Sequence, residues 1–111
     1  MAFRRGYQAE LELVDCLVQK GFYAVRVPVS GGRSFPCDVL AVKNEDRRAY
    51  EAKTTKRKVL YLYEKDIKPL VEFSQKFSFQ AYVAVRWKYK KKKPRTFIKV
   101  NQVKPLKITR R

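Results

Sequence analysis

Two apolar segments, Pro36-Cys37-Asp38-Val39-Leu40-Ala41-Val42 and Arg48-Ala49-Tyr50-Glu51-Ala52-Lys53-Thr54, decide the fold of this chain of 111 residues. Both have the composition of strands, and Asn44-Glu45 between them predicts a tight turn. Charged groups in such segments are costly to bury unless something compensates them. A divalent cation is one compensator, because hard cations take oxygen ligands from Asp and Glu.

The turn at Asn44-Glu45 also predicts which charged groups meet. If these are the two turn residues, opposite positions sum to 89, so Asp38 faces Glu51 with Cβ atoms about 5 Å apart. Lys53 lies two residues beyond Glu51 and points to the same side. A four-residue loop keeps this arrangement, whereas a loop of odd length would break it.

Helices and further strands are expected on both sides of this hairpin. A helix over residues 3–20 is predicted to end at Gly21, and a second helix over residues 64–77 tolerates Pro69 if Asp66 is its N-cap. Further strands are expected over residues 22–29, 80–87, 96–100 and 104–108. The apolar stripe of the first helix is Tyr7, Leu11, Val14, Leu17 and Val18; that of the second is Tyr63, Ile67, Leu70, Val71, Ser74 and Phe77. The order α-β-β-β-α-β-β predicts an α/β fold with a mixed central sheet flanked by helices, in one domain over residues 1–111.

Charge is the most informative bulk property. Lys and Arg total 27 against 10 Asp and Glu, a net charge of +17, which favours a polyanion as partner. An anionic membrane would call for a basic amphipathic helix, whereas the basic residues here lie mostly in loops and at the ends. With no long apolar run and no signal-peptide pattern, we expect a cytoplasmic, nucleoid-associated protein that binds nucleic acid and no membrane.

The chain contains no histidine, which excludes an imidazole base and a His-ligated zinc site. Cys16 and Cys37 lack metal-binding spacing and are expected to be reduced thiols. Glu10 falls inside the apolar arc of the first helix, so its carboxylate needs a partner. A metal or metal-bound water would serve, and the alternative is an Arg paired with a Glu at the edge of the stripe.

A family resemblance rests on four motifs. The series Gly6-x-x-x-Glu10, Ser30-Gly31, Pro36-x-Asp38 and Glu51-x-Lys53 resembles the archaeal Holliday junction resolvases, within the restriction-endonuclease-like PD-(D/E)xK nuclease superfamily. The similarity runs from the first helix to about Trp87. It implies a restriction-endonuclease-like core and a homodimeric, metal-dependent endodeoxyribonuclease. Such an enzyme cuts symmetric strands of a four-way DNA junction in recombination and repair, using Mg²⁺ or Mn²⁺.

The resemblance also implies residue roles. The expected catalytic residues are Glu10, Ser30, Asp38, Glu51 and Lys53, and the expected metal ligands are Glu10, Asp38, Glu51 and the carbonyl of Ala52. Lys53 would orient or activate the attacking water, and Ser30 matches a family residue near the scissile phosphate. Magnesium polarises a phosphoryl oxygen and acidifies bound water, so such chemistry requires no histidine.

A basic surface is expected around this site, binding phosphates without reading sequence. Its expected members are Arg4, Arg5, Arg33, Lys56, Arg57, Lys58, Lys90, Lys91 and Lys92. Trp87, Phe97 and the second helix are candidates for the dimer contact, with the core of one chain as the alternative for each residue.

Other interpretations stay open at this level. Glu51 and Lys53 can form an ordinary ion pair, and Ser30-Gly31-Gly32 can be an ordinary turn. The alternative functions are a repair or restriction-type nuclease that acts on duplex DNA, and a non-catalytic basic module that binds nucleic acid. Cleavage assays on four-way and linear DNA distinguish a junction resolvase from a duplex nuclease. Neutralising Asp38 or Glu51 distinguishes a nuclease, which loses cleavage, from a non-catalytic module, which loses no activity.

Overall fold

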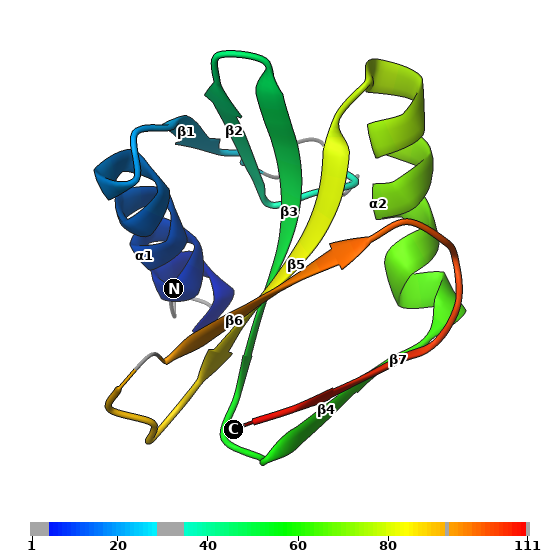
Figure 1. Cartoon of the computed structure of the whole chain (residues 1–111). Coiled ribbons are helices and arrows are strands. Elements are labelled where there is room, and N and C mark those ends of the chain that lie inside the picture. The colour runs from blue at the N-terminus through cyan, green and yellow to red at the C-terminus, as the bar shows by residue number, and fades with distance from the viewer. Residues whose placement is uncertain (1–4, 29–34, 93, 111) are drawn as a thin grey trace.

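The computed structural model, which describes residues 5–28, 35–92 and 94–110, has a mixed sheet between two helices (Figure 1). Its elements are α1 (Arg5–Gln19), β1 (Tyr23–Arg26), β2 (Val39–Lys43), β3 (Asp46–Thr55), β4 (Val59–Leu62), α2 (Glu64–Phe77), β5 (Gln80–Trp87), β6 (Arg95–Val100) and β7 (Leu106–Thr109). The main sheet has the order β1-β2-β3-β5-β6, and β4 and β7 form a separate ribbon. The predicted α/β fold is confirmed.

The hairpin of β2 and β3 has the predicted register. Val39 pairs with Tyr50 and Lys43 pairs with Asp46, so every pair sums to 89. Asn44 opens the turn with φ 55°, a left-handed value that Asn tolerates better than most residues. Strand β3 then pairs in parallel with β5, and the chain crosses between them through β4 and α2.

Helix α1 covers one face of the sheet, but its buried stripe differs from the expected one. Ala9, Leu13 and Leu17 are buried, whereas Val18, which was expected in the stripe, is 50% exposed. Residues four apart line up along a helix, and this line faces the sheet. Val18 lies about 100° around the helix from Leu17 and therefore reaches the solvent. Gly21 ends this segment with φ 96°, as predicted.

Helix α2 has the predicted bounds but a different cap. Its N-cap is Tyr63, so the expectation of Asp66 at this position is wrong. Asp66 lies in the first turn, and its Oδ2 accepts the backbone N–H of Tyr63 at 2.8 Å. The carboxylate thus caps the helix from three residues inside it. Pro69 consequently lies in the helix interior, on its exposed side.

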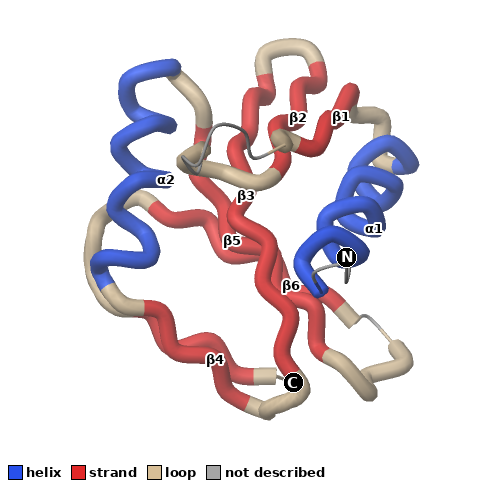
Figure 2. Tube along the Cα trace, turned by 180° about the vertical axis from the view of Figure 1, so that it is seen from behind, coloured by secondary structure: helices blue, strands red, loops and turns tan. Residues whose placement is uncertain are grey.

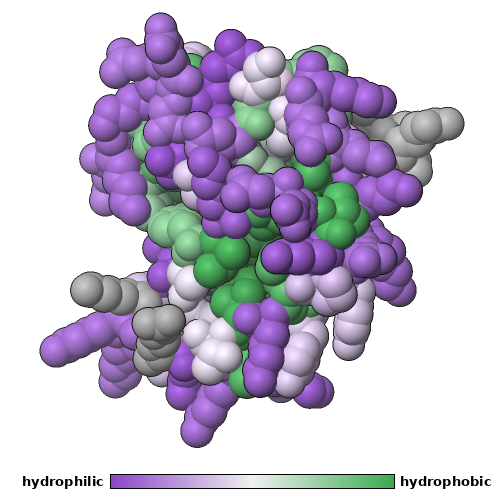
Figure 3. All heavy atoms as spheres, turned by 45° about the vertical axis from the view of Figure 1, so that its right-hand side comes forward, coloured by the Kyte–Doolittle hydropathy of each residue, from purple (hydrophilic) through white to green (hydrophobic). Residues whose placement is uncertain are grey.

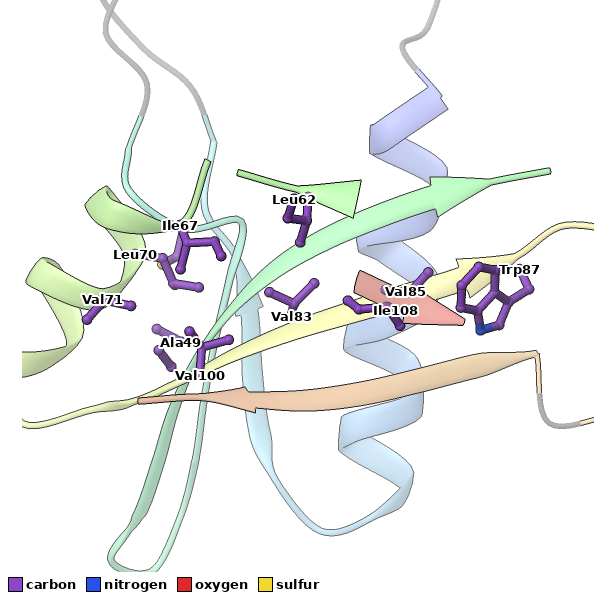
Figure 4. Close-up of a cluster of buried hydrophobic side chains, with 12 residues drawn as sticks. Ala49, Leu62, Ile67, Leu70, Val71, Val83, Val85, Trp87, Val100 and Ile108 are labelled. Carbon is purple, nitrogen blue, oxygen red and sulfur yellow. The ribbon is translucent and has the colours of Figure 1, made fainter. Parts of the chain in front are cut away.

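Two hydrophobic clusters hold the layers together. On the α1 side, Leu13 and Leu17 pack with Tyr50 of β3. On the α2 side, Ala49 of β3 packs with residues of β5, α2 and the ribbon, among which Leu62 and Ile108 lie near Val83 and Val85 (Figure 4). Because successive strand residues alternate, Glu51 and Lys53 share the α2 side with Ala49.

The ribbon of β4 and β7 corrects the predicted order of elements. It stands apart from the main sheet below α2 (Figure 2), and β4 does not appear in the sequence-based prediction. The four residues of β4 are too few to show a period by themselves, and their partner is β7, more than forty residues later. Leu62 is buried against the sheet, and this burial gives the ribbon its place.

Of the two residues expected at a dimer contact, Trp87 belongs to the core of one chain, and Phe97 packs partly against that core. Trp87 is 1% exposed, and its Nε1–H donates to Oγ1 of Thr96 at 2.8 Å. Phe97 is partly buried against the α1-side cluster, with its ring edge-to-face to that of Tyr50 at 6.0 Å. Within the part of the chain that the structure describes, neither helix is long and apolar enough to cross a membrane.

The revised stripe of α1 gives a stability prediction. Leu13→Ala removes a side chain that is 1% exposed, so it should lower the free energy of unfolding by about 2–5 kcal/mol. Val18→Ala on the same helix should change it by no more than about 0.5 kcal/mol. Urea denaturation followed by circular dichroism measures both values. Equal losses for the two variants would contradict the assignment of the buried face.

Candidate active site

Asp38 lies where three strands of the sheet meet. Its backbone N–H donates to the Tyr50 carbonyl at 2.8 Å, and its carbonyl accepts the N–H of Val27 at 2.8 Å. Its side-chain Oδ2 accepts the backbone N–H of Ala52, also at 2.8 Å. The position follows directly from the register, since residue 38 is one step beyond the pair of Val39 and Tyr50. The carboxylate is therefore held on β3 beside Glu51.

Glu51 and Lys53 extend from β3 on the same side. Lys53 Nζ lies 3.6 Å from Glu51 Oε2, and the two side chains are 36% and 23% exposed, respectively. The Ala52 N–H points toward Asp38, and the N–H and C=O of one strand residue point to the same edge. The Ala52 carbonyl is thus directed toward the same region as the carboxylates.

The electrostatics of this pair of acids are unfavourable without a cation. Burial raises the pKa of Glu51 to about 7, and the negative charge of Asp38 adds to this effect, while Lys53 opposes it. Burial also raises the pKa of Asp38. The neighbouring Cys37 thiol has its pKa raised to about 12 by burial and by both carboxylates. Lys53 alone therefore leaves the two carboxylates undercompensated.

These groups fit a hard divalent cation. Asp38 and Glu51 offer carboxylate oxygens, and Ala52 offers a carbonyl oxygen, which are the donors that Mg²⁺ takes. Among the described residues, no group of three or more Asp, Glu or Cys side chains lies close enough to hold a metal. The donor set assembled here is thus two carboxylates and one backbone carbonyl.

Glu10 lies on α1, the helix that covers the other side of the sheet. Its Oε1 is 3.3 Å from Nη1 of Arg26, and its side chain is 16% exposed. Arg26 in turn places its guanidinium over the ring of Tyr7, at 4.7 Å from the centroid. The pairing of Glu10 with an Arg, left open by the sequence, is therefore present. Glu10 still contributes to the raised pKa of Glu51.

Arg26 is the residue near this site that the sequence-based prediction missed. It is the one charged residue in an otherwise apolar segment over residues 22–29. A lone cation in such a strand predicts a buried or half-buried acidic partner, and that signal could have identified it.

The basic residues that follow β3 and β5 lie side by side. Lys88 donates its backbone N–H to the Thr55 carbonyl at 2.9 Å, which joins the ends of the two parallel strands. The exposed members of this group are Lys56, Arg57, Lys58, Lys91 and Lys92. Lys90 is half-buried, and its ammonium donates to the Lys92 carbonyl. Six of the expected DNA-binding residues thus gather at one end of the sheet.

Three other expected site residues, and the side chain of a fourth, have no structural description. Ser30, Arg4 and Arg33 lie outside the described residues, and the Arg5 side chain is likewise outside them, although its backbone begins α1.

Fold and site together define a class. A mixed sheet between two helices, with Asp38 directly before β2 and Glu51-x-Lys53 on the neighbouring β3, has the restriction-endonuclease-like architecture. A family model described as archaeal Holliday junction resolvase (Hjc) matches residues 1–109, and the chain belongs to this family.

Named relatives agree with this assignment. The chain is 38% identical over 88 residues to the crossover junction endodeoxyribonuclease Hjc of Archaeoglobus fulgidus, covering 78% of this chain and 65% of that protein. It is 29% identical over 105 residues to the Hje enzyme of Sulfolobus acidocaldarius, covering 94% and 76% of the two chains. A solved structure of Archaeoglobus fulgidus Hjc, a Holliday junction resolvase, superposes with a TM-score of 0.78 at 31% identity, covering 93% of this chain and 87% of that one.

The raised pKa of Glu51 predicts a pH-dependent stability. The ordinary value is 4.5 and the folded value is about 7, so the folded state binds more protons than the unfolded state between these values. The free energy of unfolding of the metal-free protein should therefore fall as the pH rises from about 5 to 7, and level off above. Glu51→Gln should remove this slope and stabilise the protein by roughly 1–3 kcal/mol at pH 8.

Urea denaturation in EDTA at pH 5 and pH 8 measures this effect. Glu72→Gln, on the exposed side of α2, is the matched control and should leave the slope unchanged. A Glu51→Gln variant less stable than the original protein at pH 8 would contradict the electrostatic account.

Proposed function

We propose that this protein is a metal-dependent endodeoxyribonuclease that resolves four-way DNA junctions, with the chain acting as one nuclease domain. The observation that carries the proposal is the Asp38 carboxylate, held by the Ala52 amide beside the Glu51–Lys53 pair. Family membership and the named relatives support the choice of substrate. An exposed ion pair without function would not require a partly buried second carboxylate beside it.

Each residue of the site has its own role in the proposed hydrolysis of a phosphodiester. Asp38, Glu51 and the Ala52 carbonyl would hold a Mg²⁺ ion, or Mn²⁺, which has similar oxygen-ligand preferences. When bound, the ion supplies polarisation of the phosphoryl oxygen and a more acidic water. Lys53 orients the attacking water and places positive charge where the phosphate becomes more negative. Glu10, held by Arg26, adds negative charge behind the site and does not require direct ligation.

The basic end of the sheet positions the DNA. Lys56, Arg57 and Lys58 follow directly on the strand that carries Glu51 and Lys53, so a backbone bound by them runs toward the site. Contacts of this kind bind phosphates without reading sequence, and the preference for a junction then comes from its shape. A net charge of +17 supports association with the nucleoid in the cytoplasm.

Two such sites in a homodimer would account for paired, symmetric cleavage. An apolar patch on the α2 side supports this assembly, and we define it by Val25, Phe35, Val42, Phe73 and Phe77. Phe77 is 57% exposed and stacks on Phe73 at 4.6 Å, and Phe73 meets the ring of Phe35 at 5.3 Å. Hydrophobic side chains reach the surface at several points when the right-hand side of the Figure 1 view is turned forward (Figure 3).

Among the described residues, the patch is left uncovered because α2 does not reach across the whole sheet. Helix α2 packs on β3 and β5. Val25 of β1 and Val42 of β2 alternate with residues buried under α1, so they point to the α2 side at the edge that α2 leaves open. Exposed apolar side chains gathered on one side of a sheet in this way are typical of protein interfaces. A second copy would bury it and hold two sites at a fixed separation.

The proposed chemistry predicts a separation of cleavage from binding. Asp38→Asn should lower the cleavage rate of a labelled four-way junction by at least about 100-fold while junction affinity stays within about threefold, since it removes a metal ligand only. Lys53→Ala should lose most of the rate, and EDTA should abolish it. Asp15→Asn, on the exposed face of α1, is the matched control and should cut at the original rate.

Two outcomes would redirect the proposal. Cleavage by Asp38→Asn at the original rate would favour a site elsewhere, and no cleavage by the original protein would favour a non-catalytic binding module. Equal rates on the junction and on a linear duplex of the same length would favour a duplex nuclease.

The patch predicts the oligomeric state. Phe77→Glu places a charge in the proposed contact and should weaken self-association at least about tenfold, giving a monomer in sedimentation velocity at micromolar concentration. Val18→Glu, at a similarly exposed apolar position on α1, is the control and should remain a dimer. A Phe77→Glu protein that sediments like the original protein would exclude this surface.

A further inference from the structure

An open groove of about 550 Å³ lies between the basic loop after β3 and strand β4. Tyr61 and Tyr63 line it together with Thr55, Arg57 and Lys58, and we call it the tyrosine groove. It is distinct from the Asp38–Glu51 pair and from the apolar patch, with which it shares no residue. None of the proposed catalytic steps uses its two rings.

The two tyrosine rings are unusually accessible. Tyr61 is 56% exposed and Tyr63 is 58% exposed. Within the described part of the chain, neither ring stacks on another aromatic ring or lies beneath a cation. The inward positions of β4 belong to Leu60 and Leu62, so Tyr61 faces away from the core. These rings therefore add little to the packing of the fold and present flat apolar surfaces to a ligand.

The charge around the rings selects the kind of ligand. Arg57 and Lys58 are exposed at the groove, and none of the described residues that line it is acidic. Lys107 lies directly opposite Tyr61 in the pairing of β4 with β7, so its side chain emerges on the same face. Aromatic faces among cations are the combination that binds single-stranded nucleic acid, where bases stack and phosphates pair with cations.

The groove also lies in line with the candidate active site. Glu51, Lys53 and Thr55 alternate to the same side of β3, and Thr55 forms part of the groove wall. Four residues along a strand span about 13 Å. Phosphates of one strand in a B-form duplex follow each other every 3.4 Å or so along the axis, so a groove ligand is within about four nucleotides of a phosphate at Glu51.

We propose that the tyrosine groove binds an unpaired nucleotide close to the cleavage point, with its base on Tyr61 or Tyr63 and its phosphates beside Arg57 and Lys58. This inference rests on the proposed function and adds to it one structural feature of the substrate. A base stacked within a duplex does not expose its face, so the groove binds a base only where a pair next to the branch point has opened. The preference for a junction then depends on this contact with a base as well as on the spacing of the two sites in a dimer.

The test compares three proteins: the original, the double variant Tyr61→Leu/Tyr63→Leu, and Tyr61→Phe/Tyr63→Phe. Fluorescence anisotropy measures their affinity for a labelled single strand of twelve thymidines and for a duplex of twelve base pairs. The leucine variant should bind the single strand about 5- to 100-fold more weakly, because the stacking is lost. It should bind the duplex as the original protein does. The phenylalanine variant keeps the aromatic faces and should stay within about twofold on both.

Three results would overturn the inference. Unchanged single-strand affinity in the leucine variant would exclude stacking, and an equal loss on single strand and duplex would reduce the groove to a phosphate contact. A change from dimer to monomer in sedimentation velocity would make it a protein interface. Junction cleavage by the original protein is measured in parallel, and its absence would remove the proposed function while single-strand binding still reports on the groove.

Discussion

The pairing register of β2 with β3 is the constraint on which the rest of the structure depends. A slip of one residue would move Glu51 and Lys53 from the α2 side of the sheet to the side covered by α1. The slip is prevented by hydrophobic packing, because Ala49 and Tyr50 belong to opposite clusters and each fits only one. The Ala52 N–H then fixes the Asp38 carboxylate. A charged site is thus placed by its apolar neighbours.

The two carboxylates of the site lower the stability of the metal-free protein. Burial beside Asp38 raises the pKa of Glu51 to about 7, and one lysine does not offset two carboxylates. Two partly buried carboxylates make the metal-free protein less stable than a neutral pair of side chains would. The same carboxylates provide oxygen donors for a cation. Perturbed acids of this kind are common at functional sites, where activity and stability compete.

The two sides of the sheet differ in what they carry: one packs against α1, and the other holds the candidate active site. Helix α1 packs on β1, β2 and β3 and holds Glu10 against Arg26. The other side is only partly covered by α2 and the β4–β7 ribbon, and it carries the carboxylates, the apolar patch and the tyrosine groove. Incomplete coverage of the α2 side therefore leaves the surfaces that we propose for DNA and for a second chain, while the packing of α1 on β1, β2 and β3 supplies the core on the other side.

The sequence by itself determined the elements whose information is local. The turn at Asn44-Glu45 and the alternation around it determined that Asp38 lies opposite Glu51, and continuous patterns determined the bounds of α2 and β5. Tertiary structure alone decided the partner of Glu10, the burial of Trp87 and the position of β4 in a ribbon with β7. The reason is physical: turn geometry and side-chain alternation act between neighbours in the chain. The pairing of a charge or a short strand depends on which distant segment packs against it.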